Sequence, residues 1–161
     1  MRWLALLSAA VVIAALTGAS HASAAGDGVA VAGSYTPTDF GSTSCALVGG
    51  SGFILRCDTT GFVTEYTGDL EGSAVADFTQ LIDCKTGRAY GHGSETFTGT
   101  LTGVGSGTLT YTDQFSSDFD CTSGFPFNLD IDSVAVAGSG GLSGLQGKIH
   151  FDDTSYSGNL H

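Results

Sequence analysis

The feature that most constrains this chain is a two-residue alternation of apolar and polar side chains, which runs through most of the sequence after residue 24. No segment there repeats apolar residues at three- and four-residue intervals for two turns, as an amphipathic helix would. Clusters of Gly, Ser, Asp and Asn interrupt the alternation, as they do at hairpin turns. The sequence therefore predicts an all-β fold, with strands near residues 28–35, 43–48, 53–58, 62–70, 73–82, 89–101, 106–116, 126–136, 145–151 and 156–160.

The connections between these strands are short and leave no room for a crossover helix, which predicts antiparallel up-and-down pairing. A sheet of this many strands normally curls or closes to remove its edges. The expected fold is a closed or nearly closed antiparallel barrel of about eight strands, with a short N-terminal disulfide hairpin. Glycine-rich turns at residues 68–72, 99–103 and 138–144 are separated by two strands each, so they fall at one end. The connections at 83–88, 117–125 and 152–155 mark the other end, which we expect to be the open one.

Residues 1–24 have the three-part layout of a secretory signal. Arg2 gives a positive start, an apolar run follows from residue 4 to residue 16, and Ala22-Ser23-Ala24 forms an A-x-A cleavage site. The run is shorter than the roughly 20 residues that span a bilayer. We therefore expect a secreted protein without membrane insertion, whose residues 25–161 form one domain.

The net charge limits which partners the chain can bind, and the cysteine content indicates in which compartment it resides. The formal net charge is −11, so the chain is not attracted to a nucleic-acid backbone. The four cysteines form no C-x-x-C motif, and an even number in an exported chain favours disulfides over zinc. A hairpin centred on Ser51 places Cys45 opposite Cys57. A hairpin near Val104 brings Cys84 beside Cys121. These are the two pairings that the sequence predicts.

The alternation also sorts side chains between the two faces of the sheet. It predicts an aromatic and aliphatic interior and a threonine-rich exterior. To keep Val134 and Val136 inside, the strand near 126–136 needs a bulge near Asp132. The inward residues expected to contact a ligand are Tyr66, Phe78, Glu95, Phe97, Tyr111, Phe115 and Phe127.

Three ordered motifs carry a family resemblance. They are Tyr66-Thr67-Gly68-Asp69-Leu70-Glu71-Gly72, the segment from Gly93 to Leu101, and the segment from Val136 to Gly147. Together they resemble an uncharacterised bacterial family grouped with allene oxide cyclase-like barrels, and the last is also similar to the glycine-rich turn of plant dirigent proteins. The resemblance spans roughly residues 60–152 and implies an eight-stranded antiparallel barrel. It implies no particular chemistry. The cysteines and the N-terminal hairpin have no counterpart in the family pattern.

Glu95 is the sharpest candidate for chemistry. It shares parity with Phe97, so it is expected to point into an apolar interior, where burial raises a carboxyl pKa. Asp113 points inward from the adjoining strand, and such a pair can act as general acid or base. The alternative for Glu95 is a core acid that is hydrogen-bonded by Tyr66, Tyr111 or a buried water. The alternative for Asp113, which lies nearer the expected open end, is a solvated acid. His92 falls on the opposite parity and is expected to face outward.

Other catalytic and metal-binding motifs are weak or absent. No G-x-S-x-G elbow occurs at a strand-to-helix turn, and no cofactor motif is found. Four acids, Asp118, Asp120, Asp152 and Asp153, lie in connections at the predicted open end and have the hard oxygen ligands that calcium prefers. They form no D-x-[DN]-x-[DN]-G loop. We expect them to be solvated turn acids and expect no metal site.

Three functions fit these features. The first is a secreted barrel that binds a small apolar ligand inside, which the aromatic interior favours. The second is a cyclase or isomerase that uses the inward Glu95, by analogy with the resembling fold. The third is an extracellular structural or interaction protein with a filled interior. A cavity distinguishes the first two from the third, because side chains can just fill an eight-stranded interior.

Overall fold

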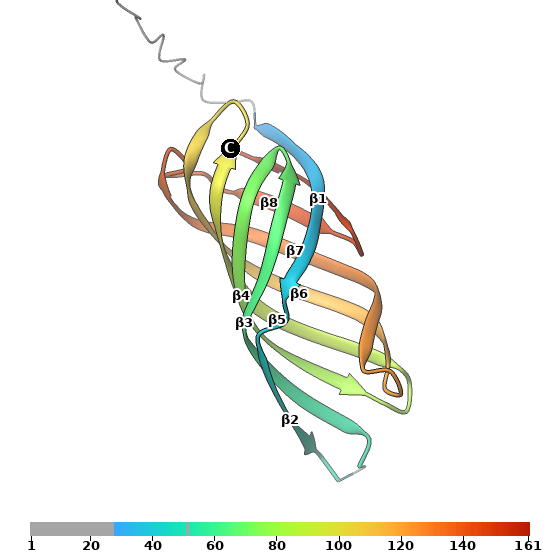
Figure 1. Ribbon diagram of the computed structural model, residues 1–161. Coiled ribbons are helices and arrows are strands. Elements are labelled where there is room, and N and C mark those ends of the chain that lie inside the picture. Colours follow the sequence, from blue (N-terminus) through green and yellow to red (C-terminus); the bar gives the residue numbers. More distant parts are fainter. Residues whose placement is uncertain (1–27, 51) are drawn as a thin grey trace, which may run out of the picture.

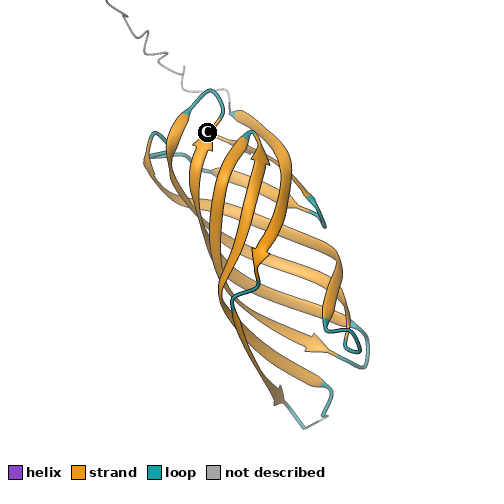
Figure 2. Cartoon of the chain, in the orientation of Figure 1, coloured by secondary structure: helices purple, strands orange, loops and turns teal. Residues whose placement is uncertain are grey.

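The computed structural model describes residues 28–50 and 52–161 (Figure 1). The predicted signal, residues 1–24, lies outside the described residues. Everything described is strand, turn or loop (Figure 2), which confirms the all-β prediction. The strands are β1 (Val29–Asp39), β2 (Ser42–Val48), β3 (Ile54–Gly68), β4 (Leu70–Asp83), β5 (Arg88–Leu101), β6 (Gly105–Asp120), β7 (Phe125–Gly140), β8 (Gly147–Phe151) and β9 (Ser155–Leu160).

The strands form one antiparallel sheet in the order β1-β9-β8-β7-β6-β5-β4-β3-β2. An additional pairing of β1 with β3 joins the two sides, so eight strands hydrogen-bond in a closed ring. The predicted strands at 53–58 and 62–70 are in fact one strand, β3. It contains a register shift between Thr59 and Phe62, where Gly61 has a φ of 71°. The bulge interrupts the two-residue alternation between residues 58 and 62, and this interruption is why the sequence predicted two strands with a loop between them.

The ring closes over only part of the length of its strands. β1 pairs with the C-terminal half of β3, and β2 pairs with the N-terminal half. β8 pairs with β7 from Ile131 to Ala135. Before Ile131, β7 therefore pairs with β6 alone among the described strands. Figure 1 shows the consequence: a closed upper part, and a lower part in which β2 to β7 continue as a curved sheet. We call these the closed end and the open end.

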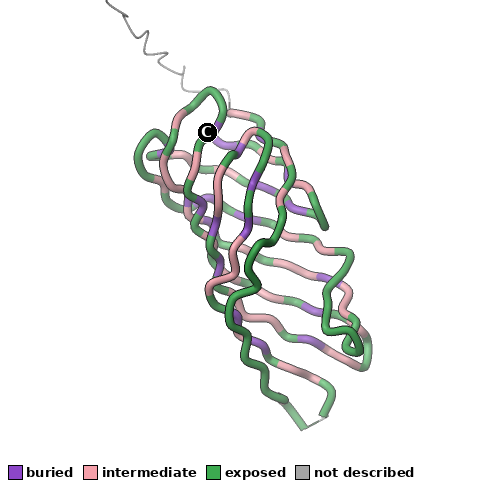
Figure 3. Tube along the Cα trace, viewed as in Figure 1, coloured by how far each residue is buried: buried purple, intermediate pink, exposed green. Residues whose placement is uncertain are grey.

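The main core fills the closed end (Figure 3). Five leucines there have no exposed surface, and they come from strands and turns on all sides of the ring. Around them pack the aromatic rings of Tyr66, Phe97, Tyr111, Phe151 and Tyr156. The glycine-rich turns predicted to gather at one end cover this core. The five leucines are Leu70, Leu101, Leu109, Leu142 and Leu160.

The open end has only a small core and both disulfides. Cys57, Ile82 and Ala89 form a second buried cluster. Cys45 pairs opposite Cys57 in the β2–β3 hairpin and is bonded to it, and Cys84 is bonded to Cys121. Both predicted disulfide pairings are therefore present. The covalent links lie where apolar packing is thinnest.

The predicted faces of β7 need two corrections. Phe127 was expected inside, but its side chain is half exposed on the outer face. The reason is Asn128, whose φ of 52° breaks the alternation, so that Leu129 and not Phe127 faces inward.

The bulge expected near Asp132 is also wrong. Ser133 and Ala135 are the buried residues there, while Val134 and Val136 face out. The register shifts between β6 and β7 instead lie at Thr110/Tyr111 and at Ser116/Asp118.

Candidate ligand-binding cavity

The open end encloses a cavity of about 720 Å³. Its walls are mainly apolar, and β1 to β8 all contribute side chains. A row of four aromatic rings crosses one wall, each in an edge-to-face or near-perpendicular arrangement with the next. The centroid distances are 5.8 Å for Phe40–Phe62, 5.8 Å for Phe62–Phe78 and 5.6 Å for Phe78–Phe115. Such arrangements are the favoured geometry for aromatic pairs.

Two inward-facing glycines of β5 create the room for these rings. A Cβ on Gly91 would lie 2.1 Å from a ring carbon of Phe115, and one on Gly93 would lie 2.6 Å from the Cβ of Phe78. Each added Cβ would also lie 2.6 Å from a backbone oxygen of β4, so a side chain at either position would displace that strand as well as the Phe115 ring or Phe78. The alternation Tyr90-Gly91-His92-Gly93 was the sequence signal for this feature. It went unrecognised because inward glycines do not add to an apolar pattern.

The facing wall comes from the strands at which the ring is incomplete. Leu129 and Ile131 of β7 line the cavity, as do Tyr35 and Pro37 of β1. Tyr35 donates a hydrogen bond to the carbonyl of Asp152. This bond ties β1 to the β8–β9 turn.

Glu95 lies at the floor of the cavity, where the open end meets the filled core. It faces inward from β5 as the alternation predicts, and it accepts a hydrogen bond from the Tyr66 hydroxyl of β3. Burial raises the pKa of Glu95 to about 7; the Tyr66 hydrogen bond opposes this shift, and the negative charge of Asp113 adds to it. The floor thus holds a carboxyl group that exchanges its proton near neutral pH.

Asp113 is the second acid of the floor. Its Oδ1 accepts a hydrogen bond from the Ser133 hydroxyl at 2.6 Å. Burial raises the pKa of Asp113 above its usual range, and the Ser133 bond partly offsets this effect. The two acids thus have separate hydrogen-bond donors. Tyr111, the cross-strand partner of Glu95, has a buried hydroxyl with no hydrogen-bond partner among the described residues.

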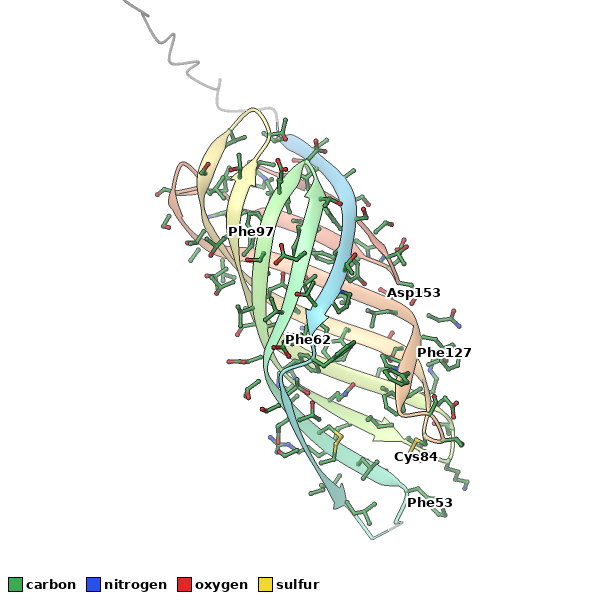
Figure 4. All side chains as sticks on the ribbon, in the orientation of Figure 1. Phe53, Phe62, Cys84, Phe97, Phe127 and Asp153 are labelled. Atoms are coloured by element: carbon green, nitrogen blue, oxygen red, sulfur yellow. A yellow bond between two sulfur atoms is a disulfide. The ribbon has the colours of Figure 1, made fainter. Side chains whose placement is uncertain are left out.

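The predicted ligand-contact residues divide into three groups. Tyr66, Phe78, Glu95 and Phe115 line the cavity, as does Asp113. Phe97 and Tyr111 belong to the filled core of the closed end and do not line the cavity. Phe127 lies outside, and Figure 4 labels it on β7, with Phe97 at the closed end and Phe62 between them. Sequence reasoning missed Phe40, Phe119, Phe125 and Pro126, which lie at or next to loops where alternation gives no face.

The four loop acids do not converge on one point. Asp120 and Asp152 accept backbone N–H bonds within their own turns, and Asp118 is paired with Arg88 and Asn128. Asp153 accepts the backbone N–H of Leu129 at 2.7 Å. Within residues 28–50 and 52–161, no group of three or more acidic, His or Cys side chains is arranged to hold a metal ion. His92 is exposed on the outer face, as expected.

No family model and no curated protein matches the chain. Among solved structures, it is similar to a protein of unknown function from the DUF3224 family of Shewanella oneidensis MR-1. The TM-score is 0.58 at 16% identity, over 84% of this chain and 98% of that one. This likeness supports the fold alone. In the part of the chain that the structure describes, no helix is long and apolar enough to cross a membrane.

Proposed function

We propose that this protein binds a small, largely apolar molecule in the cavity of its open end. One observation carries the proposal. The same ring of strands that is filled with side chains at its closed end leaves about 720 Å³ at the other, lined by aromatic rings. Cavities of this size, with mainly apolar walls and a few convergent polar groups, are the usual form of small-molecule sites.

The setting of this site is part of the proposal. Residues 1–24 act as a secretory signal, and the closed ring is an eight-stranded barrel of the allene oxide cyclase-like kind. Two disulfides are consistent with an oxidising compartment. Intact mass of the exported protein tests the first point: a chain that begins at Ala25 supports it, and an uncleaved Met1 contradicts it.

Binding can be tested with N-phenyl-1-naphthylamine, a neutral apolar dye whose fluorescence rises in a dry site. We expect a saturable signal at one dye per chain. Gln80→Trp places a large side chain in the cavity and should abolish the signal, because Gln80 faces inward from β4. Gln114→Trp is the matched control, since Gln114 is exposed on the outer face of β6. Equal dye binding by both variants and the parent protein would contradict the proposal.

A second function is favoured by Glu95 itself. A carboxyl group with a pKa of about 7, bonded to Tyr66 at the floor of a cavity, is suited to general acid–base catalysis of an isomerisation or cyclisation. The two functions differ in the fate of the ligand. A binding protein returns its co-purifying molecule unchanged after incubation, as mass spectrometry would show. An enzyme converts it, and Glu95→Gln stops the conversion without releasing the ligand.

A third function, a structural protein with a filled interior, predicts no cavity. The cavity of the open end disfavours this function, because its inward aromatic rings line open space.

A further inference from the structure

All the ionisable side chains of the cavity, apart from its tyrosines and the disulfide cysteines, are acidic. Glu95 and Asp113 lie at the floor and Asp153 at the rim, whereas none of the described Lys, Arg or His residues contributes to the lining. The two arginines within residues 28–50 and 52–161 are exposed and already paired outside the cavity, Arg56 with Asp58 and Arg88 with Asp118. The field inside the cavity is therefore negative, and its apolar walls weaken the screening by water.

The two floor acids are also incompletely bonded. Each uses one oxygen in a hydrogen bond, to Tyr66 or to Ser133. For the second oxygen of each, no hydrogen-bond donor is found within residues 28–50 and 52–161. The acids occupy diagonal positions on β5 and β6, with Gly93 opposite Asp113 and Tyr111 opposite Glu95. Diagonal positions on paired strands lie roughly 7–8 Å apart, a spacing that one small cationic group can bridge.

We propose that the cavity selects cationic amines: molecules with a flat or compact apolar body and one ammonium group, which binds between Glu95 and Asp113 while the body lies against the aromatic row. This deepens the proposed function and rests on it. An ammonium group has three donors and no acceptor, which matches a floor that offers carboxylate oxygens. The rings of Phe62, Phe78 and Phe115 suit the apolar body and attract a cation that passes over their faces.

The same floor discriminates against anions. A bound carboxylate would place a third negative charge beside Glu95 and Asp113, with no basic group among the described lining residues to receive it. Burying an unpaired charge is costly. A neutral alcohol avoids this repulsion but gains no ion pair. The expected order of affinity is therefore amine, then alcohol, then carboxylate.

Amine binding should depend on pH through the floor acids. The groups that face Glu95 are Tyr66 from β3, Tyr35 from β1, and Tyr111 and Asp113 from β6; β4 presents only Ala76. The tyrosine pKa values lie above their usual range, so these hydroxyls stay neutral. As pH falls through about 7, Glu95 takes up a proton and the amine loses one of its two anionic partners. Because binding competes with uptake of one proton by Glu95, the amine affinity falls by nearly tenfold per pH unit below the Glu95 pKa. Between about pH 7.5 and about pH 5.5 this amounts to a loss of about 20-fold.

The test uses three probes with one ring system: 2-naphthylmethylamine, 2-naphthylmethanol and 2-naphthoate. Calorimetry with the oxidised protein near pH 7.5 should show the amine binding at least about tenfold more tightly than the alcohol, with the carboxylate weakest. Glu95→Gln should weaken the amine by about tenfold or more and the alcohol by less than about threefold. Glu65→Gln is the matched control, because it removes one exposed carboxylate from the outer face of β3; it should change neither.

The outcomes separate the two proposals. If 2-naphthoate binds as tightly as the amine, or the amine shows no weakening at lower pH, selection for cations is wrong while the cavity remains a binding site. Selection for cations is equally wrong if N-phenyl-1-naphthylamine binds and the naphthyl amine does not. If neither the dye nor any of the three probes binds, the proposed function itself fails. The unmodified protein decides the order of affinities even if Glu95→Gln does not fold.

Discussion

At the closed end, β1, β8 and β9 complete the ring and its interior is filled by leucines and aromatic rings. At the open end, β3 to β7 continue beyond the pairing with β8, and together with residues of β1, β2 and the end of β8 they line a cavity. The difference comes from strand length. β3 to β7 have 14 to 16 residues, whereas β8 has 5 and β9 has 6. At about 3.3 Å per residue, the long strands extend roughly 30 Å beyond the length of the short ones.

One sheet can thus provide both stability and a site. Closure brings inward side chains from all sides into contact, which buries them fully at one end. Where closure stops, inward side chains face a gap, and two disulfides reinforce the frame. Stability should therefore depend mainly on the closed end, and binding on the open end.

The largest expected effect tests this division directly. Leu109→Ala removes a fully buried side chain at the closed end and should lower the free energy of unfolding by about 3–5 kcal/mol. Phe115→Ala removes a half-buried ring that lines the cavity and should cost about 1–2 kcal/mol, but it should weaken dye binding. Denaturant unfolding of the oxidised proteins measures the first quantity. Equal destabilisation by the two variants would contradict the division.

The disulfides should differ from each other. Cys84–Cys121 closes a sequence separation of 37 residues and Cys45–Cys57 one of 12. Restriction of the unfolded chain gives about 4 kcal/mol for the longer loop and about 3 kcal/mol for the shorter one. When each cysteine pair is replaced with alanines, the loss in the free energy of unfolding, measured with urea, should be larger for Cys84–Cys121 than for Cys45–Cys57. A larger loss from the Cys45–Cys57 pair would show that the β2–β3 hairpin stabilises the open end through native contacts.

Glu95 should make stability depend on pH. Its folded pKa of about 7 lies above the ordinary value of 4.5, because burial disfavours the charged form. The folded state therefore holds the extra proton, and stability is lost as pH rises from about 4.5 to about 7, by about 1–3 kcal/mol. Asp113 adds to this loss in the same direction. The pKa values of Asp120 and Asp152 are lowered by hydrogen bonds within their turns. These acids therefore affect stability only below about pH 4, where it falls as they take up protons.

Urea unfolding across this pH range measures the effect. Glu95→Gln should flatten the pH dependence, leaving only the smaller contribution of Asp113. Glu65→Gln, on the outer face, should leave the pH dependence of the free energy of unfolding unchanged. A parent protein whose stability stays constant from about pH 4.5 to about pH 7 would contradict the buried position of the Glu95 carboxyl group.

Sequence reasoning worked where hairpins and two-residue alternation fix geometry. The β2–β3 hairpin places Cys45 opposite Cys57, and the β5–β6 hairpin brings Cys84 and Cys121 to the same end. Alternation also placed Glu95 and Phe97 on the inner face. It could not show that one lines a cavity and the other a filled core, because that depends on where β8 ends relative to β7. Pairing lengths between distant strands leave no local pattern.

The errors have equally local causes. A single left-handed residue, Asn128, reverses the face of the residues before it. Alternation cannot reveal this, because the pattern records which side chains are apolar and not the backbone φ. Val134 and Val136 looked like core residues by their apolar character. The structure buries the smaller Ser133 and Ala135 instead, opposite the inward-facing Ile149 and Tyr111.

The smallest expected effect marks the boundary of the open end. Phe127 is 49% exposed and does not line the cavity, whereas Leu129, two residues later, does. Phe127→Ala should therefore lower the free energy of unfolding by less than about 1 kcal/mol and leave dye affinity unchanged. Leu129→Ala, matched in position and on the same strand, should weaken dye binding, because it removes apolar contact from the cavity wall. If Phe127→Ala weakens the dye as much as Leu129→Ala does, then Asn128 does not reverse the strand face, and Phe127 reaches the ligand after all.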